Sequence, residues 1–260
     1  MFNSPPERTF SQTYVARILV FILVLGVVFI VLAIADLEVN KVPLIGWVII
    51  AATLGLFAFF WEWSAKRRLN IHPEGVSFGA GSSSKDFPWE EIAETRYYQM
   101  NNAAIHFGLI GMLVANYSSG GINTKSGSLE IRGADGKKFT VNTMLSHGDQ
   151  AIQLVLGRVN PRLKADIVRR LNGGESVAFG PVNLSRQGVS FKDKPEVAFN
   201  LAEIKFNGMR FRVKEKGKWM DAIGVPARQV PNIFVLLEIA SELQGTAASP
   251  MSNPQAYMKA

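Results

Sequence analysis

The chain has 260 residues, of which 48% are hydrophobic, a formal net charge of +7 and no cysteine. The lack of cysteine excludes disulfide bonds and thiolate metal sites, and it fits a reducing compartment. The apolar residues are concentrated near the N-terminus, which excludes a single ordinary soluble domain.

Two long apolar segments follow the first few residues. Residues 18–35 and 42–61 contain no charged side chain. A helix of about 20 apolar residues can cross the roughly 30 Å hydrocarbon core of a membrane. Only residues 36–41 separate the two segments. The pattern therefore predicts an antiparallel hairpin of two transmembrane helices, at about 15–36 and 42–63.

The charges beside these segments predict an orientation. Lys66, Arg67 and Arg68 follow the second segment, whereas the short loop carries Asp36 and Glu38. Positive residues stay on the cytoplasmic side, so we expect an integral protein of the cytoplasmic (inner) membrane with both termini and all later residues in the cytoplasm. An alternative is that the first segment is a signal peptide cleaved after its Ala-Ile-Ala sequence, although its apolar stretch exceeds the usual length of about 7–15 residues.

Two short phrases occur twice in the rest of the chain. Gly-Val-Ser-Phe stands at 75–78 and 188–191, and a second phrase stands at 87–94 (FPWEEIAE) and 199–206 (FNLAEIKF). The two copies are offset by 113 and then 112 positions. This regularity predicts an internal repeat.

Each copy continues with a predicted hairpin that turns at a glycine, Gly136 in the first and Gly217 in the second. The offset here falls to 81, so the first copy is predicted to carry an insertion at about 97–127. Phe211 and Val213 alternate with basic residues, and residues 129–132 show the same alternation of apolar and charged side chains. Such alternation predicts half-buried antiparallel strands.

A helix is predicted to close each copy. Ser146 and Asp149 resemble a capping box before the first helix, and apolar residues at helical spacing over 233–243 predict the second. Between them, an Asn-Pro pair at 160–161 resembles an N-cap and first helical residue. It predicts a separate bracing helix at 161–172.

This arrangement resembles the bacterial pleckstrin-homology-like (PH-like) domains of small membrane proteins. A strand with Gly-Val-Ser-Phe, the FPWEEI phrase, a glycine-turned hairpin and one closing helix carry the resemblance, over about 68–158 and 175–244. The second copy is shorter and has Leu201 where the first has Trp89, which leaves open whether its barrel is complete. The resemblance implies a turn glycine and two barrel-filling residues in each copy, namely Gly75, Trp89 and Ile92, and then Gly188, Leu201 and Ile204.

The predicted fold is therefore a membrane-anchored α+β protein, with two transmembrane helices followed by tandem PH-like antiparallel β modules, each closed by a C-terminal helix. We expect an N-terminal segment and anchor at 1–65, a first module at 66–172, a second module at 173–244 and a disordered tail at 245–260.

Basic residues are the first candidates for a binding role. Those beside the second apolar segment could contact anionic lipids, although a topology signal alone explains them. Those of the second hairpin share one face of a strand and its turn, where they could bind lipid phosphates or an acidic partner, or simply form a solvated sheet face that discourages edge pairing. The candidates are Lys66, Arg67, Arg68, Arg210, Arg212, Lys214, Lys216 and Lys218.

The insertion is the second candidate. Residues 103–115 carry no formal charge and are too short to span a membrane. They suit either an interfacial segment that contacts the membrane or a partner, or an extra helix packed on the barrel. Its apolar candidates are Ile105, Phe107, Leu109, Ile110, Met112 and Leu113.

Signatures of catalysis are scarce. His72, His106 and His147 have neither a histidine one helical turn away nor an acidic cluster nearby, which favours structural roles. The glycine- and serine-rich residues 77–85 lack the spacing of a phosphate-binding loop. We therefore expect no enzyme activity, no catalytic residue, no metal, no cofactor and no nucleic acid.

The sequence favours a non-enzymatic scaffold that binds a partner protein or anionic lipid headgroups. The expected partners are membrane lipids, a membrane protein or further copies of the chain. The alternative is an accessory or regulatory subunit of a transporter or envelope enzyme complex. Sequence alone predicts neither the ligand nor the oligomeric state.

Overall fold

A computed structural model describes residues 4–11, 68–79, 84–101, 125–142, 147–192 and 194–245, together with positions 2, 26, 48, 51–52, 54–55, 58–59 and 145. The chain divides into two compact units. One comprises residues 1–86 and 144–146, and the other comprises residues 87–143 and 147–260.

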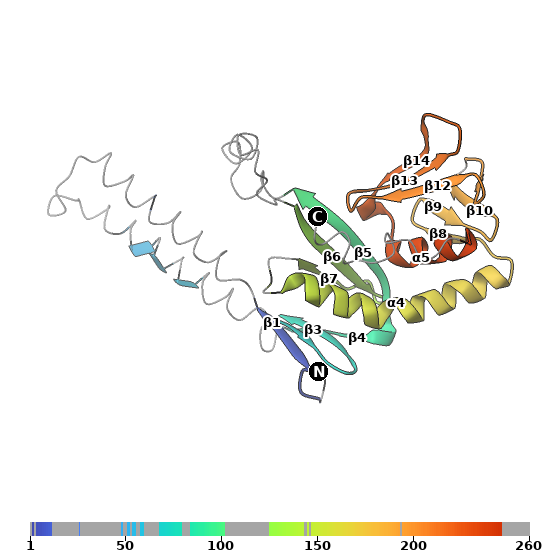
Figure 1. Cartoon of the computed structure of the whole chain (residues 1–260). Helices are drawn as coiled ribbons and strands as arrows, with labels where there is room; N and C mark the ends of the chain where they lie inside the picture. The colour runs from blue at the N-terminus through green and yellow to red at the C-terminus, as the bar shows by residue number, and fades with distance from the viewer. Residues whose placement is uncertain are drawn as a thin grey trace. The chain divides into compact units, whose positions relative to one another are not determined.

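The first unit is built on a four-stranded sheet in the order β1-β2-β3-β4 (Figure 1). Its strands are β1 (Arg8–Ser11), β2 (Arg68–Ile71), β3 (Gly75–Gly79) and β4 (Lys85–Pro88). In β1 and β2, Phe10, Leu69 and Ile71 are buried. Ser11 lies opposite Arg68 in the antiparallel pair of β1 and β2.

The second unit begins with a three-stranded antiparallel sheet in the order β5-β6-β7, followed by a long helix (Figure 1). A short 3-10 helix, η3 (Trp89–Glu91), precedes the sheet. The elements are β5 (Ile92–Asn101), β6 (Lys125–Gly133), β7 (Lys138–Asn142) and α4 (Gly148–Asn172). α4 lies against β7 and against the C-terminal helix α5 (Ile233–Leu243).

Two further sheets follow α4. The first has the order β11-β10-β9-β8 and the second the order β12-β13-β14. Their strands are β8 (Val177–Phe179), β9 (Val182–Leu184), β10 (Gly188–Phe191), β11 (Val197–Ala198), β12 (Ala202–Phe206), β13 (Arg210–Glu215) and β14 (Asp221–Pro226). A 3-10 helix, η4 (Ala227–Gln229), leads from β14 towards α5.

The same order of elements thus occurs twice along the chain, as a four-stranded sheet, a three-stranded sheet and a helix. The repeated Gly-Val-Ser-Phe phrases form β3 and β10. Gly75 and Gly188 each open their strand after a tight turn, closed by hydrogen bonds from His72 N to Gly75 O (2.8 Å) and from Ser185 N to Gly188 O (3.0 Å). The glycine-turned hairpins join β6 to β7 and β13 to β14, as predicted.

The barrel-filling residues differ between the copies. Trp89 and Ile92 are 7% and 0% exposed, so both enter the core. Leu201 is 43% exposed and Ile204 is half-buried. The expectation that Leu201 takes the place of Trp89 is therefore wrong, because the residue before β12 lies at the surface.

No helix in the described part of the chain is long and apolar enough to cross a membrane. α4 has 25 residues but carries charged side chains along its length, and α5 has only 11 residues, which rise about 16 Å. This finding overturns the expected membrane-anchored α+β fold, and with it the expected transmembrane hairpin and inner-membrane localisation. The segments predicted at 15–36 and 42–63 lie outside the described residues, apart from positions 26, 48, 51–52, 54–55 and 58–59.

The predicted bracing helix at 161–172 is not a separate element. α4 runs without interruption from Gly148 to Asn172 and contains Pro161. Proline inside a helix removes one hydrogen bond. Buried apolar residues on both sides of Pro161, including Val159 and Leu163, offset the loss of this hydrogen bond. The residue before α4 is His147, which provides no side-chain cap, and Ser146 lies outside the described residues.

Candidate functional site

The outer surface of the β12-β13-β14 sheet gathers the basic residues of the second hairpin. Phe211 and Val213 of β13 and Ile223 and Val225 of β14 point inward and are at most 3% exposed. Because side chains alternate along a strand, the residues between them point outward. Lys205 of β12 and Arg210, Arg212 and Lys214 of β13 lie on this outer side, and Lys216 and Lys218 follow in the adjoining turn; we call these six residues the basic face.

The strand register places two cations directly opposite each other on this face. Lys205 of β12 pairs with Arg212 of β13. Like charges opposite each other destabilise a sheet by about 0.2–1 kcal/mol. The next outward pair, Glu203 with Lys214, has opposite charges. The repulsion between Lys205 and Arg212 therefore destabilises the folded sheet, and the fold itself gains nothing from placing these two charges together.

Three carboxylates offset part of this charge. Glu203 pairs with Lys205 (Oε1 to Nζ, 2.8 Å), Glu215 with Lys218 (2.6 Å) and Asp221 with Arg212 (3.7 Å). The hydrogen bond from Lys205 lowers the pKa of Glu203. Between Ala202 and Pro226 the chain has six basic and three acidic residues. The net charge of this surface is clearly positive.

Apolar side chains are exposed at one end of the same sheet. Trp219 is 87% exposed and Met220 is 61% exposed, both in the loop between β13 and β14. Leu201 lies at this end as well, because its carbonyl oxygen accepts a hydrogen bond from the backbone N–H of Lys216 (2.8 Å). We call Leu201, Trp219 and Met220 the hairpin tip.

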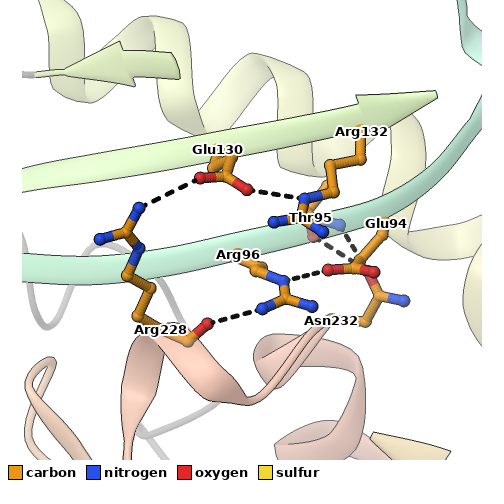
Figure 2. Close-up of polar contacts among 7 residues, drawn as sticks. All are labelled: Glu94, Thr95, Arg96, Glu130, Arg132, Arg228 and Asn232. Carbon is orange, nitrogen blue, oxygen red and sulfur yellow. Dashed lines mark hydrogen bonds and ion pairs between the residues drawn. The ribbon is translucent and has the colours of Figure 1, made fainter. Parts of the chain in front are cut away.

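A second group of polar residues joins the two halves of the second unit (Figure 2). Asn232, the residue before α5, accepts hydrogen bonds at Oδ1 from Thr95 N (2.8 Å) and Thr95 Oγ1 (3.2 Å), and its own N–H donates to Thr95 O (2.6 Å). Asn232 has a φ of 50°, a left-handed conformation that asparagine tolerates better than most residues. We call this set of contacts the seam.

The charged part of the seam centres on Glu130 of β6. Its side chain is 4% exposed and pairs with Arg132 (2.7 Å) on one side and Arg228 of η4 (3.7 Å) on the other (Figure 2). The Arg228 guanidinium also lies over the Tyr98 ring, 5.2 Å from its centroid. Arg96 donates to the Arg228 carbonyl oxygen (3.2 Å) and pairs with Glu94.

Burial opposes the ionisation of Glu130, but its neighbours outweigh that effect. The hydrogen bond from Arg132 and the positive charges of Arg132, Lys138 and Arg228 together lower the pKa of Glu130. The carboxylate is therefore ionised at neutral pH. Because it is bound on two sides by arginines, this geometry suits a structural ion pair.

Aromatic packing continues the seam on the inner side of β5. Tyr97 lies 5.1 Å from Phe234 and 6.4 Å from Phe206 between ring centroids. Burial raises the pKa of Tyr97 to about 12. Gln99 N donates to Gly208 O (2.9 Å), and a Cβ on Gly208 would lie 2.3 Å from the Gln99 side chain. Gly208 has a φ of +79°, which favours glycine at this contact.

The structure brings only some of the predicted candidates together. Arg210, Arg212, Lys214, Lys216 and Lys218 share the basic face. Arg68 is exposed in β2, which belongs to the other unit. Lys66, Arg67 and the insertion candidates of 105–113 lie outside the described residues.

The described histidines have structural surroundings. His72 is buried, with Nδ1 3.1 Å from Ser4 O and Nε2 3.2 Å from Ser77 Oγ. His147 precedes α4, and His106 lies outside the described residues. Within the described part of the chain, no group of three histidines or carboxylates could hold a metal ion.

Sequence reasoning missed the hairpin tip and the seam. A tryptophan and a methionine directly after a lysine-flanked glycine turn were a usable signal for the tip, because such a turn offers no core position. No local signal marked Glu130, since its partner Arg228 lies 98 positions away.

Comparison with known proteins gives a family match. A family model described as "Family of unknown function (DUF6585)" matches residues 3–247. No curated protein and no solved structure matches the chain.

Proposed function

We propose that this chain, which belongs to the DUF6585 family of unknown function, is a non-enzymatic binding protein whose basic face holds an acidic segment of a partner protein. The observation that carries the proposal is the directly opposed pair of Lys205 and Arg212. A carboxylate of an acidic partner reduces the repulsion between these two side chains. Relief of this repulsion then adds to the free energy of binding.

The local chemistry supports a carboxylate-bearing partner. Arg210 and Arg212 can each hold a carboxylate through two parallel N–H groups, which fixes its orientation as well as its position. Both are exposed, and Arg212 contacts its neighbour Asp221 only at 3.7 Å. A partner carboxylate can therefore replace or extend that weak contact.

The proposal includes the fold family. Each repeat is a PH-like module, and the support is the twofold order of a four-stranded sheet, a three-stranded sheet and a helix. Such a fold provides a scaffold, not a chemistry, so the binding role depends on the basic face alone.

The test measures binding of a fluorescein-labelled peptide of alternating Glu and Ser to the full chain by fluorescence anisotropy. In the variant Arg210→Glu/Arg212→Glu/Lys214→Glu, we expect affinity to fall about 30-fold, because three attractions of about 0.3 kcal/mol each become repulsions of similar size, about 2 kcal/mol in all. Binding by the unaltered chain should also weaken as NaCl is raised.

The matched control reverses three exposed basic residues elsewhere in the second repeat, Arg186→Glu/Lys192→Glu/Lys194→Glu. Both triple variants have the same net charge. We expect the control to keep most of the affinity. An equal loss in the two variants would show that only overall charge matters and would refute the basic face as the binding site.

A further inference from the structure

The hairpin tip exposes more apolar surface than its fold requires. Tryptophan is usually well buried, yet Trp219 is the most exposed large apolar residue among those the structure describes, at 87%. The core beneath the sheet is already complete, since Phe211, Val213, Ile223 and Val225 are at most 3% exposed. Trp219 and Met220 therefore do not serve as core residues.

The loop that carries these side chains is held in a defined turn. Lys218 N donates to Glu215 O (3.0 Å), and Gly217 has a φ of +83°, which favours glycine. Lys216 N is bound to Leu201 O at the base of the turn. An aromatic side chain on such a fixed turn loses little entropy when it binds, since it has only two side-chain torsions.

Basic residues connect the tip to the basic face without a break. Lys216 and Lys218 flank the turn, and Lys214, Arg212 and Arg210 continue along β13. Arg210 to Glu215 of β13 cover about 17 Å of extended chain, and the turn that carries Lys216 and Lys218 follows directly. A single extended acidic segment can reach from the strand to the tip.

We propose that the hairpin tip binds a large apolar side chain of the same acidic segment that the basic face holds. This inference rests on the proposed function and specifies the partner: an extended peptide with several carboxylates and one aromatic or long aliphatic residue at one end. Tryptophan, methionine and arginine are among the residues enriched where proteins bind each other.

The charge pattern favours a peptide over an anionic lipid surface. A flat surface that meets the tip end-on leaves Arg210 out of reach at the far end of β13. A surface that meets the sheet face-on also meets Glu203 and Asp221, which repel it. An extended peptide can place its carboxylates opposite the basic residues alone.

The experiment uses two labelled peptides of the same acidic sequence, one ending in Phe and one ending in Ala, with the full chain. We expect the Phe peptide to bind about tenfold more tightly, as burial of one large apolar side chain allows. Trp219→Ala should abolish this difference. Met209→Ala should retain it, because Met209 is also exposed (46%) but lies at the other end of β13.

Tryptophan fluorescence tests whether the peptide contacts Trp219. The emission of the chain's five tryptophans should shift to the blue when the Phe peptide binds, and Trp219→Phe should remove this shift. A Phe advantage that survives in Trp219→Ala would overturn the inference. Equal binding of the two peptides would overturn it as well, while leaving the proposed function intact.

Failure of both peptides to bind the unaltered chain would refute the proposed function itself. Vesicles of anionic phospholipid form the remaining arm. Vesicle binding that depends on Trp219, together with no peptide binding, would assign the tip to a lipid surface and overturn both proposals.

Discussion

The sheets β5-β6-β7 and β12-β13-β14 occupy equivalent places in the two repeats, yet they use charge in opposite ways. In the first, Glu130 of the central strand lies opposite Arg96 and is covered by Arg228 (Figure 2). In the second, Arg212 of the central strand lies opposite Lys205 and faces solvent. The first sheet neutralises its charges by internal ion pairs, and the second exposes its charges to solvent.

The difference follows from what covers each sheet. In the first sheet, the backbone of Asn232 is hydrogen-bonded to Thr95 of β5, and Arg228 of η4 reaches the buried Glu130 on the outer side. The outer side of β12 and β13 keeps Glu203, Lys205, Arg210 and Arg212 exposed. A duplicated fold can thus use one copy for internal assembly and the other for binding. Three measurements on stability test this division.

The largest effect is expected at Asn232, which pins α5 to β5. Asn232→Ala should lower the free energy of unfolding by about 3 kcal/mol, because the buried Thr95 loses a hydrogen-bond acceptor and alanine disfavours a φ of 50°. Urea denaturation followed by tryptophan emission, to which the buried Trp89 contributes, measures this.

Two further variants separate the causes. Asn232→Gly keeps the backbone conformation available and should lose only about 2 kcal/mol. Asn172→Ala changes an exposed asparagine at the end of α4 and should have an effect below about 0.5 kcal/mol. If Asn232→Ala behaves like Asn172→Ala, the seam does not hold the two repeats together.

The next effect concerns Glu130 and pH. Glu130→Gln should cost about 2 kcal/mol at pH 7, since charge-assisted hydrogen bonds contribute about 1.5–3 kcal/mol. Because folding lowers the pKa of Glu130, its contribution is fully present above the unfolded-state value near pH 4.3 and is lost as the pH falls through the folded value.

The measurement is urea denaturation of both proteins between pH 3 and pH 7, a range that brackets the glutamate pKa. We expect the difference between the unaltered chain and Glu130→Gln to shrink as the pH falls. Glu90→Gln removes an exposed carboxylate of η3 and should leave stability within about 0.5 kcal/mol. A difference that is constant over the range would contradict the ion-pair role.

How well the sequence predicted an element depended on how local its determinants are. The alternation in β13 and the helical spacing in α5 were predicted correctly, because the inward residues of each element are close together in the chain. β1 was missed, since four residues have a weak pattern and their partner β2 starts at Arg68. The two predicted helices within 146–172 proved to be one, because burial on both sides of Pro161 outweighs its local preference.

The candidate site shows the same limit. The basic strand could be predicted, since its charges alternate with Phe211 and Val213 over a few residues. The burial of Glu130 could not, because alternation along β6 gave it the same solvent-facing position as Arg212. Only the approach of Arg228 from the other repeat changes its surroundings. The expected membrane anchor was the largest error, and hydropathy over 18–61 was its sole basis.

The smallest effect is the most direct test of the contrast between the two sheets. Double-mutant cycles isolate the interaction within a pair from all its other contacts. With Lys205→Thr and Arg212→Thr, we expect a repulsive coupling of about 0.5 kcal/mol that disappears in about 1 M NaCl. With Glu130→Gln and Arg228→Gln, we expect an attractive coupling of about 0.5–1 kcal/mol that salt reduces less, because Glu130 is buried. Couplings of the same sign in the two cycles would remove the electrostatic distinction between the repeats, and the basic face would then be an ordinary solvated sheet surface.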